Sequence, residues 1–399
     1  MRIALIAPPS PFLMAQNVHG PLGLWSLGAV LRQAGHEPVY CDLGLGDPLP
    51  DGCDVWALTG TTPQWDGIQA VAKQATVPLV VGGPHASAKP DDLLALGATV
   101  VVGEGEQALP ALLGKRKRPK PGIVRAERIT DLDALPFPDR SQQHRYHYSI
   151  TGRDGTAHPA ATAITSRGCP HQCAFCSGGV WERRVTYRSA ANVLEEMAQL
   201  RDLGYDAVHF YDDSLALKTR RLQALCKGLR GLGMVWRCFV RADQMSAETL
   251  AYMAAAGCVE IGVGVESGSQ AVLDAIHKGE TVEQQAAAIG WAHDAGIRVK
   301  AFIIVGLPGE SWWTVAETER FLERTRPDDV DVTLLQLYPG SALYDAPERY
   351  GLRVRRTGGW YKGRPGEYVP SAGTSGAGPV FLAGARTYLE RRFKRWAAA

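Results

Sequence analysis

Three cysteines stand close together in the segment Cys169-Pro-His-Gln-Cys173-Ala-Phe-Cys176. This spacing supplies three thiolates to an iron–sulfur cluster, whereas clusters that only carry electrons usually have four. Three thiolates leave one iron of a [4Fe–4S] cluster open to a further ligand, so that the cluster can act as a reagent. A zinc site is the main alternative, but zinc needs a fourth ligand. Because His171 lies inside the loop, too close to Cys169 and Cys173 for the usual ligand spacings, we expect an iron–sulfur cluster.

The cysteine spacing, with an aromatic residue before the last cysteine, resembles the radical S-adenosylmethionine (SAM) superfamily. In that family the open iron chelates the amino and carboxylate groups of SAM, and one electron cleaves SAM to a 5′-deoxyadenosyl radical. The resemblance implies that Cys169, Cys173 and Cys176 are catalytic metal ligands and that Phe175 covers the adenine edge of SAM. It also implies an electron donor such as flavodoxin or ferredoxin.

Further residues match the radical SAM pattern at the ends of expected strands. The resemblance places Asp212 and Asp213 at the methionine amino group, where a carboxylate would pair with an ammonium. It places Arg241 at the SAM carboxylate, Glu266 at the ribose hydroxyls, and Gly306 in the adenine-side motif. Each has a structural alternative, because an aspartate can cap a helix and Glu266 can form a salt bridge inside a barrel.

The N-terminal half resembles the cobalamin-binding domain that precedes the barrel in the cobalamin-dependent radical SAM enzymes. The resemblance is carried by Ala7-Pro8-Pro9, Pro21-Leu22-Gly23-Leu24, Gly35-His36, Gly82-Gly83-Pro84-His85-Ala86 and Gly103-Glu104-Gly105-Glu106. A doubly wound sheet binds its ligand at the carboxyl ends of its strands, and paired glycines let backbone approach a bulky corrinoid. The resemblance therefore implies cobalamin as a cofactor, with contacts from Gly82, Gly83, His85, Gly103 and Glu104.

One departure from the family pattern concerns the lower face of the corrin. Classical cobalamin domains carry an Asp-x-His-x-x-Gly motif whose histidine ligates cobalt, but the nearest match here is Asp42-Leu43-Gly44. We therefore expect no histidine ligand, with Gln64 or Trp65 nearest the cobalt from below. An unligated lower face would favour transfer of the methyl group as a radical.

Two βα series must position these residues. In the first, candidate strands at 3–7, 37–41, 55–59, 79–81 and 99–102 alternate with helical patterns, as in a parallel sheet. In the second, strands at 161–165, 207–211, 235–240, 260–265, 300–305 and 332–337 predict a partial (β/α)6 barrel with its site at the strand C-termini. The expected fold class is α/β. We expect a doubly wound, flavodoxin- or Rossmann-like cobalamin domain over 1–125, a linker over 126–160, a radical SAM barrel over 161–345 and a C-terminal extension over 346–399.

Composition excludes several classes of partner. The formal net charge of +2 over 399 residues argues against a nucleic-acid partner. No apolar run is long enough for a transmembrane segment, although the basic run from Arg386 to Trp396 leaves a peripheral membrane contact open beside packing on the barrel. Five cysteines outside the motif lack evident pairing, which indicates a reducing, cytoplasmic setting.

These features predict a cobalamin-dependent radical SAM methyltransferase. It would transfer a methyl group from methylcobalamin to an unactivated carbon, or a phosphinate phosphorus, of a small molecule. The alternative keeps both cofactors but catalyses cyclisation, ring contraction or oxidation without methyl transfer, as in the magnesium-protoporphyrin oxidative cyclases, which share this layout. A non-catalytic redox sensor is disfavoured by the full set of apparent SAM contacts. Methylthiotransferases are excluded because no second cysteine triad precedes Cys169.

Overall fold

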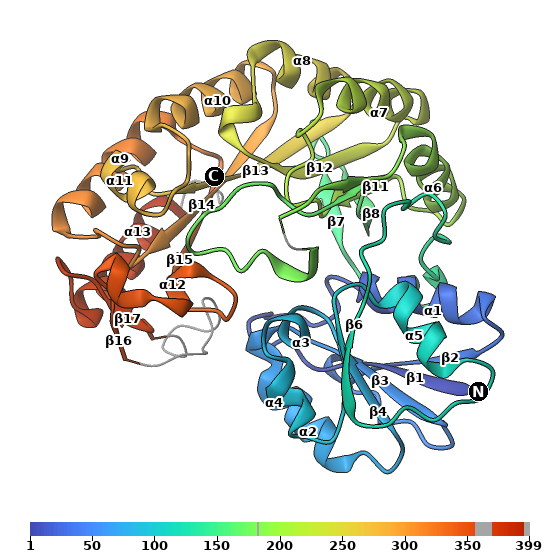
Figure 1. The fold of residues 1–399 in the computed structure, drawn as a ribbon. Helices are drawn as coiled ribbons and strands as arrows, with labels where there is room; N and C mark the ends of the chain where they lie inside the picture. The colour runs from blue at the N-terminus through green and yellow to red at the C-terminus, as the bar shows by residue number, and fades with distance from the viewer. Residues whose placement is uncertain (182, 356–368, 395–399) are drawn as a thin grey trace. The chain divides into compact units, whose positions relative to one another are not determined.

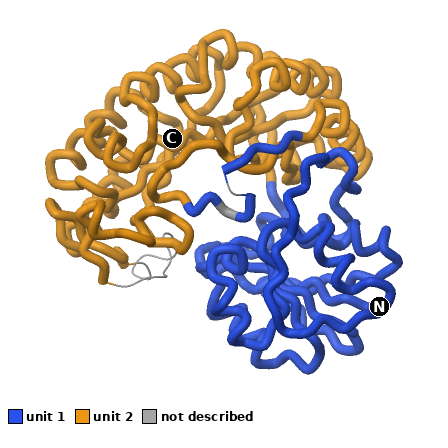
Figure 2. The backbone as a smooth tube through the Cα atoms, in the orientation of Figure 1, with its two compact units in different colours: residues 1–148, 177–187 blue, residues 149–176, 188–399 orange. Residues whose placement is uncertain are grey.

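The computed structural model describes residues 1–181, 183–355 and 369–394. Two compact units make up the chain: residues 1–148 with 177–187, and residues 149–176 with 188–399 (Figure 2). No helix within these described ranges is long and apolar enough to cross a membrane. Each unit has its own hydrophobic core and is described separately.

A six-stranded parallel sheet forms the centre of the first unit (Figure 1). Its order is β2-β1-β3-β4-β5-β6, with β1 (Arg2–Ala7), β2 (Glu37–Asp42), β3 (Val55–Thr59), β4 (Leu79–Gly82), β5 (Thr99–Val102) and β6 (Gly122–Arg125). Helices α1 (Leu22–Gln33) and α5 (Gly105–Leu113) contribute to one core cluster, and α2 (Trp65–Gln74), α3 (Pro84–Ala88) and α4 (Pro90–Leu94) to another. Strand β1 is buried on both faces, as is typical of a central parallel strand. The predicted doubly wound sheet is confirmed, while β6 was missed.

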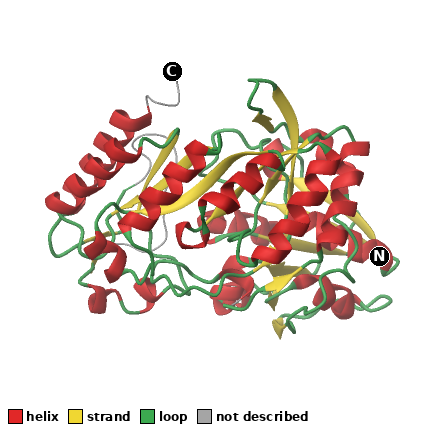
Figure 3. Cartoon of the chain, turned by 90° about the horizontal axis from the view of Figure 1, so that it is seen from above, coloured by secondary structure: helices red, strands yellow, loops and turns green. Residues whose placement is uncertain are grey.

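The second unit is built on a seven-stranded sheet of order β15-β14-β13-β12-β11-β8-β7. The six parallel strands are β8 (Ala157–Ala163), β11 (Ala207–Phe210), β12 (Val235–Val240), β13 (Cys258–Glu266), β14 (Arg298–Val305) and β15 (Asp329–Leu334), and β7 (Ser149–Thr151) is an antiparallel edge. The helices between them are α6 (Ala190–Asp202), α7 (Thr219–Leu232), α8 (Ala247–Ala255), α9 (Gln270–Ala275), α10 (Val282–Asp294) and α11 (Trp312–Thr325). They follow the outer side of the curved sheet (Figures 1 and 3). The predicted partial (β/α)6 barrel is confirmed.

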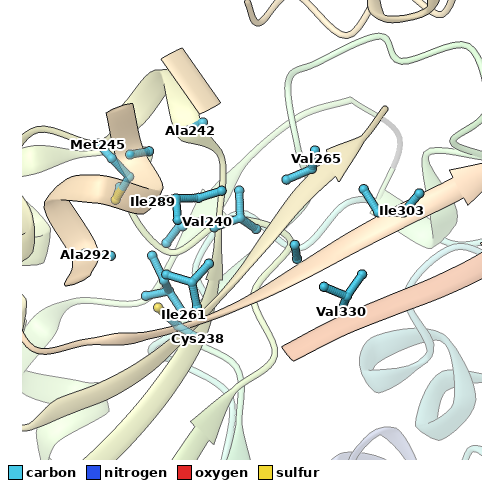
Figure 4. Packing of buried hydrophobic residues seen from close by; sticks show 14 of the residues in the cluster. Cys238, Val240, Ala242, Met245, Ile261, Val265, Ile289, Ala292, Ile303 and Val330 are labelled. Carbon is cyan, nitrogen blue, oxygen red and sulfur yellow. The ribbon is translucent and has the colours of Figure 1, made fainter. Parts of the chain in front are cut away.

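Alternation along the barrel strands separates core from concave face. In β12 the buried Cys238 and Val240 alternate with the half-buried Arg237 and Phe239. The buried set packs with Ile261, Ile303, Val330 and the α10 residues Ile289 and Ala292 (Figure 4). Hydroxyl side chains cap α6, α8, α10 and α11, as at Ser189 of α6, whose side chain accepts from Asn192 N. The residues at the alternate positions, such as Arg237 and Phe239, therefore line the concave face of the sheet.

The C-terminal helix α13 (Pro379–Phe393) covers the β15 edge of the barrel. Leu389 and Phe393 are fully buried, and Arg386 Nε donates to the Val332 carbonyl at 3.1 Å. Tyr388 of the same helix remains 47% exposed, and its hydroxyl donates to Glu319. The described part of this helix therefore packs on the barrel, whereas Trp396, the end of the basic run, lies outside the described residues.

Candidate active site

The cysteine loop follows β8 and the short strand β9 (Ser166–Arg167). Its centre is fixed from two sides, because Ala174 N donates to the Ile276 carbonyl at 2.8 Å and Ala174 O accepts from Leu343 N at 3.0 Å. Cys173 is buried, Cys169 is half-buried and Cys176 is exposed. The loop is therefore held at its middle while its thiols lie at different depths.

Two buried cations lie beside the deepest of these thiols. Burial raises the pKa of Cys173 above its ordinary value, and Lys278 and Arg241 offset part of that rise. The guanidinium Nη1 of Arg241 donates to Cys173 Sγ at 3.8 Å. Positive charge next to a cysteine favours the thiolate, which is the form that binds metal. The surroundings of Cys173 therefore fit a thiolate ligand.

The thiols do not form a site for one ion. Among the described residues, no three His, Cys, Asp or Glu side chains form a group that could hold a single metal ion. Thiolates that each bind a different iron of a cluster need not converge on one point. The loop is thus compatible with a [4Fe–4S] cluster, whose ligands would be Cys169, Cys173 and Cys176.

Asp212 braces the strand that leads into the loop. Its fully buried carboxylate accepts from Thr165 N at 3.0 Å, Thr165 Oγ1 at 2.7 Å and Ser166 Oγ at 2.5 Å. Burial raises the pKa of Asp212, and these hydrogen bonds lower it. Because both oxygens are engaged, the structure gives Asp212 a role in fixing Thr165 and Ser166.

The neighbouring Asp213 lies at the start of the loop. Its side chain is exposed. The surrounding protein and the neighbouring Asp212 raise the pKa of its carboxyl, and a hydrogen bond from the Gly168 N–H lowers it. Asp213 is also close enough to Cys169 to raise the pKa of that thiol. Of the two aspartates predicted to meet the methionine amino group, Asp213 is therefore the one with an accessible carboxylate.

Glu266 ends β13 in a left-handed conformation with φ +64°. Its Oε1 accepts from Lys278 Nζ at 3.0 Å, and Lys278 also lies 3.9 Å from Glu280. Arg241 bonds Asp243 and the Lys278 carbonyl and lies 3.3 Å from Glu280. The structure thus brings the predicted Arg241 and Glu266 into one charged network. Sequence reasoning missed Lys278 and Glu280, because Lys-Gly-Glu in a turn gives no signal of burial.

The adenine-side segment contains a buried carboxyl that sequence reasoning also missed. Gly306, with φ +100°, donates its N–H to Glu310 Oε2 at 2.7 Å. Burial raises the pKa of Glu310 to about 7. Phe175 is half-buried and packs against the barrel core. Glu310 therefore holds the turn after β14 in place.

In the first unit, the strand order reverses between β1 and β3, where a doubly wound sheet binds its ligand. Gln64 braces this point. Its Nε2 donates to Pro8 O at 2.8 Å and Ser10 Oγ at 3.2 Å, and its Oε1 accepts from Thr61 N at 3.0 Å. The predicted cobalt neighbour Gln64 is thus tied to the loop after β1.

His85 has an open hydrogen-bonding atom in this region. It is buried, its ring lies 4.7 Å from that of Trp65, and its Nδ1 is 3.1 Å from Thr62 Oγ1. Burial lowers the pKa of His85, and its buried Nε2 has no partner within the described structure. Gly83 has φ +93°, and a Cβ there would lie 2.4 Å from Thr59 Oγ1. An orphan nitrogen beside such a turn fits a polar ligand at the ends of β3 and β4.

The remaining predicted cobalamin contacts are held by the protein itself. Gly103 N donates to Ser87 Oγ at 3.1 Å. Glu104 is buried and accepts from Ile129 N at 2.8 Å. Its carboxylate therefore anchors the segment after β6, whereas Gly82 would tolerate a Cβ at ordinary contact distance.

Side chains pack closely around Gly44, where this chain departs from the Asp-x-His-x-x-Gly motif of classical cobalamin domains. A Cβ at this position would lie 2.7 Å from Gln16 Oε1 and 3.0 Å from Asp42 Oδ1. Asp42 itself accepts from Gly44 N at 2.8 Å and from the Tyr146 hydroxyl at 2.5 Å. A histidine at this position of the motif would therefore require the Gln16 or Asp42 side chain to move.

Comparison with known proteins gives matches in both units. The family model of the radical SAM superfamily matches residues 163–322, and that of the B12 binding domain matches residues 13–113. An uncharacterized methyltransferase of Pyrococcus horikoshii is 28% identical over 86% of this chain and 83% of its own length. The anaerobic magnesium-protoporphyrin IX monomethyl ester cyclase of Rubrivivax gelatinosus is 29% identical over 45% of this chain and 33% of its own length. The radical SAM methyltransferase TsrM of Kitasatospora setae, solved with cobalamin and a [4Fe–4S] cluster, has a TM-score of 0.68 at 16% identity, covering 89% of this chain and 76% of TsrM.

The two units therefore define a radical SAM enzyme with an N-terminal B12-binding domain. The chain thus carries a B12-binding domain followed by a radical SAM domain, and this pairing indicates a [4Fe–4S] cluster, SAM and cobalamin as its cofactors.

Proposed function

We propose that this enzyme methylates an unactivated carbon, or a phosphinate phosphorus, of a small molecule. The observation that carries the proposal is the joint presence of a three-cysteine loop and a B12-binding sheet in a chain that matches a methyltransferase over 86% of its length. When bound, the cluster and SAM supply one-electron chemistry and cobalamin supplies the methyl group. The protein's own task is to hold these groups and the substrate in place.

The residues of the second unit divide this task. Cys169, Cys173 and Cys176 would hold the cluster, while Asp213 and Glu266 would bind the amino group and ribose of SAM. The concave face would receive the substrate. The Phe239 and Phe302 rings lie on this face with their centroids 5.8 Å apart. These rings favour a substrate with an apolar or aromatic surface.

Reduction requires an outside electron donor, for which flavodoxin or ferredoxin is our proposal. None of the eight cysteines, all of which lie within the described residues, forms a disulfide. Free thiols and an oxygen-sensitive cluster both suit a reducing compartment, so we place the enzyme in the cytoplasm.

The alternative function is cyclisation, ring contraction or oxidation without methyl transfer. The match to the Rubrivivax cyclase favours it, but that match covers 45% of this chain. Product mass separates the two functions, because methylation adds a carbon and rearrangement adds none.

The test begins with anaerobic reconstitution with iron, sulfide and hydroxocobalamin, which should give about four irons and about one cobalt per chain. Candidate substrates are then incubated with methyl-labelled SAM and a reductant. We expect one 5′-deoxyadenosine and one S-adenosylhomocysteine per labelled product, whereas Cys176→Ala should form neither 5′-deoxyadenosine nor product. Turnover without S-adenosylhomocysteine, or an unlabelled product, would refute methyl transfer and support the alternative.

A further inference from the structure

Backbone strain gathers around one buried ion pair in the barrel. Among the described residues, three non-glycine residues have positive φ: Glu266 at +64°, His277 at +53° and Arg326 at +46°. Two of them adjoin the pair, since Glu266 is its acid and His277 precedes its base, Lys278. Such conformations persist where surrounding contacts enforce them, and they cluster at functional sites.

The pair is enclosed by the protein. Glu266 is 7% exposed and Lys278 is 5% exposed, with Oε1 and Nζ 3.0 Å apart. A Cβ at Gly264 would lie 2.5 Å from Glu266 Oε1 and 3.0 Å from Lys278 Nζ. The pair therefore rests directly on β13 at a position where glycine leaves room for it.

Contacts on the far side of Glu266 pin the turn that carries it. Gly268 N and Ser267 Oγ both bond Thr318 Oγ1 of α11, at 3.0 Å and 3.2 Å. The backbone of Glu266 is thus fixed by this turn, and the Lys278 ammonium holds Oε1 of its carboxylate.

Lys278 also connects this carboxylate to the cysteine loop. Arg241 Nη2 donates to the Lys278 carbonyl at 2.8 Å, and Arg241 Nη1 donates to Cys173 Sγ at 3.8 Å. A short path of two residues thus joins Glu266 to a thiol of the loop.

We propose that Lys278 is a positioning residue for SAM: it orients Glu266 toward the ribose hydroxyls and joins that carboxylate, through Arg241, to Cys173. The inference rests on the proposed function of Glu266 as the ribose acceptor. Lys278 itself touches neither SAM nor substrate in this scheme.

The experiment measures SAM binding to the anaerobically reconstituted full chain by equilibrium dialysis, without turnover. It also follows the EPR spectrum of the reduced cluster during SAM titration. Lys278→Met should retain iron but bind SAM about tenfold more weakly, and the spectral change should need correspondingly more SAM. Lys278→Arg should restore part of the affinity, because it keeps a buried cation near Glu266.

Two further variants keep the proposal testable if Lys278→Met folds poorly. Gly264→Ala displaces the pair without removing a charge, and it should also weaken SAM binding. The double variant Glu266→Gln with Lys278→Met leaves neither member unpaired, and it should bind SAM no worse than Glu266→Gln alone. Additive losses would show that Lys278 acts independently of Glu266 and would overturn the proposal.

Matched controls are Lys300→Met, which removes a lysine paired with Asp329 at 2.6 Å in the same sheet, and Gly290→Ala, where an added Cβ meets nothing within 4 Å. Both should bind SAM like the unchanged chain. Unaltered SAM affinity in Lys278→Met or Gly264→Ala would overturn the proposal, as would unaltered affinity in Glu266→Gln. An enzyme that shows these SAM effects but turns over its substrate to an unlabelled product would refute the methyltransferase function and leave the role of Lys278 standing.

Discussion

The buried carboxyl of Glu310 makes stability depend on pH. Its pKa is raised from 4.5 to about 7 by burial, so the unfolded chain releases this proton at lower pH than the folded chain. The contribution to stability is therefore fully present below about pH 4.5 and is lost as pH rises toward 7. Glu310→Gln keeps an acceptor for Gly306 N and removes the ionisation. We expect the free energy of unfolding of Glu310→Gln, relative to that of the unchanged chain, to increase by about 1–3 kcal/mol between pH 5 and pH 8.

Urea unfolding of Glu310→Gln and the unchanged chain, at pH 5 and at pH 8, measures this difference in the free energy of unfolding. The exposed Glu248 offers a control, since Glu248→Gln should shift stability equally at the two pH values. A difference between Glu310→Gln and the unchanged chain that stays constant with pH would contradict the argument.

The adjacent aspartates after β11 give a second prediction about single residues. Asp212→Asn places an NH2 group among the donors of Thr165 and Ser166, which we expect to cost about 2–4 kcal/mol and to lower cluster loading. Asp213→Asn leaves those contacts intact and should retain iron while weakening SAM binding. Iron analysis and dialysis of the two variants, prepared in parallel, check this. Equal iron contents would show that Asp212 does not brace the cysteine loop.

Among the elements, the turn after β2 carries a prediction about stability. Gly44→Ala forces a Cβ to within 2.7 Å of Gln16 Oε1 and should destabilise the chain by about 1–3 kcal/mol. Gly23→Ala in α1, where a Cβ meets nothing within 4 Å, should be neutral or mildly stabilising. Thermal unfolding of the two variants compares them.

The residue type at position 44 also predicts the spectrum of bound cobalamin. Because glycine supplies no imidazole there, the EPR spectrum of the Co(II) form should show no histidine-nitrogen splitting. A splitting that disappears in His85→Ala would instead identify the orphan Nε2 of His85 as the cobalt ligand.

Regular elements were predictable from sequence because their side-chain periods repeat over several residues. The buried run of β1 and the alternation in β12 both follow the expected patterns. Short elements and the partners of individual side chains were not predictable from the sequence. Strand β6 has four half-buried or exposed residues and so gives no apolar signal.

The finer assignments at the site depend on turns that have no period. Asp212 and Asp213 are chemically alike, and only the turn after β11 decides which one points into the protein. Lys278 bonds Glu266, which lies twelve positions earlier in the chain, and Glu266 and His277, which precedes Lys278, both have a left-handed backbone that no periodic pattern predicts. Glu104 matched a family motif, yet its carboxylate anchors Ile129.

For the whole molecule, the chain trace predicts how the two units share stability. Residues 177–187 belong to the first unit, although they directly follow the cysteine loop of the second. Each unit has its own apolar core, so we expect two thermal transitions in anaerobic calorimetry. Hydroxocobalamin at about 100 times its Kd should stabilise the first unit by about 2.7 kcal/mol. That gain should raise one transition by roughly 5–10 °C, whereas SAM added to the reconstituted chain should raise the other.

Selective variants assign the transitions. Gly44→Ala should lower the transition that responds to cobalamin, and Asp212→Asn should lower the one that responds to SAM, because each change lies within a single unit. A single transition that both ligands raise together would contradict this division. It would mean that the crossing segment 177–187 couples the two cores so strongly that neither cofactor can stabilise its own unit alone.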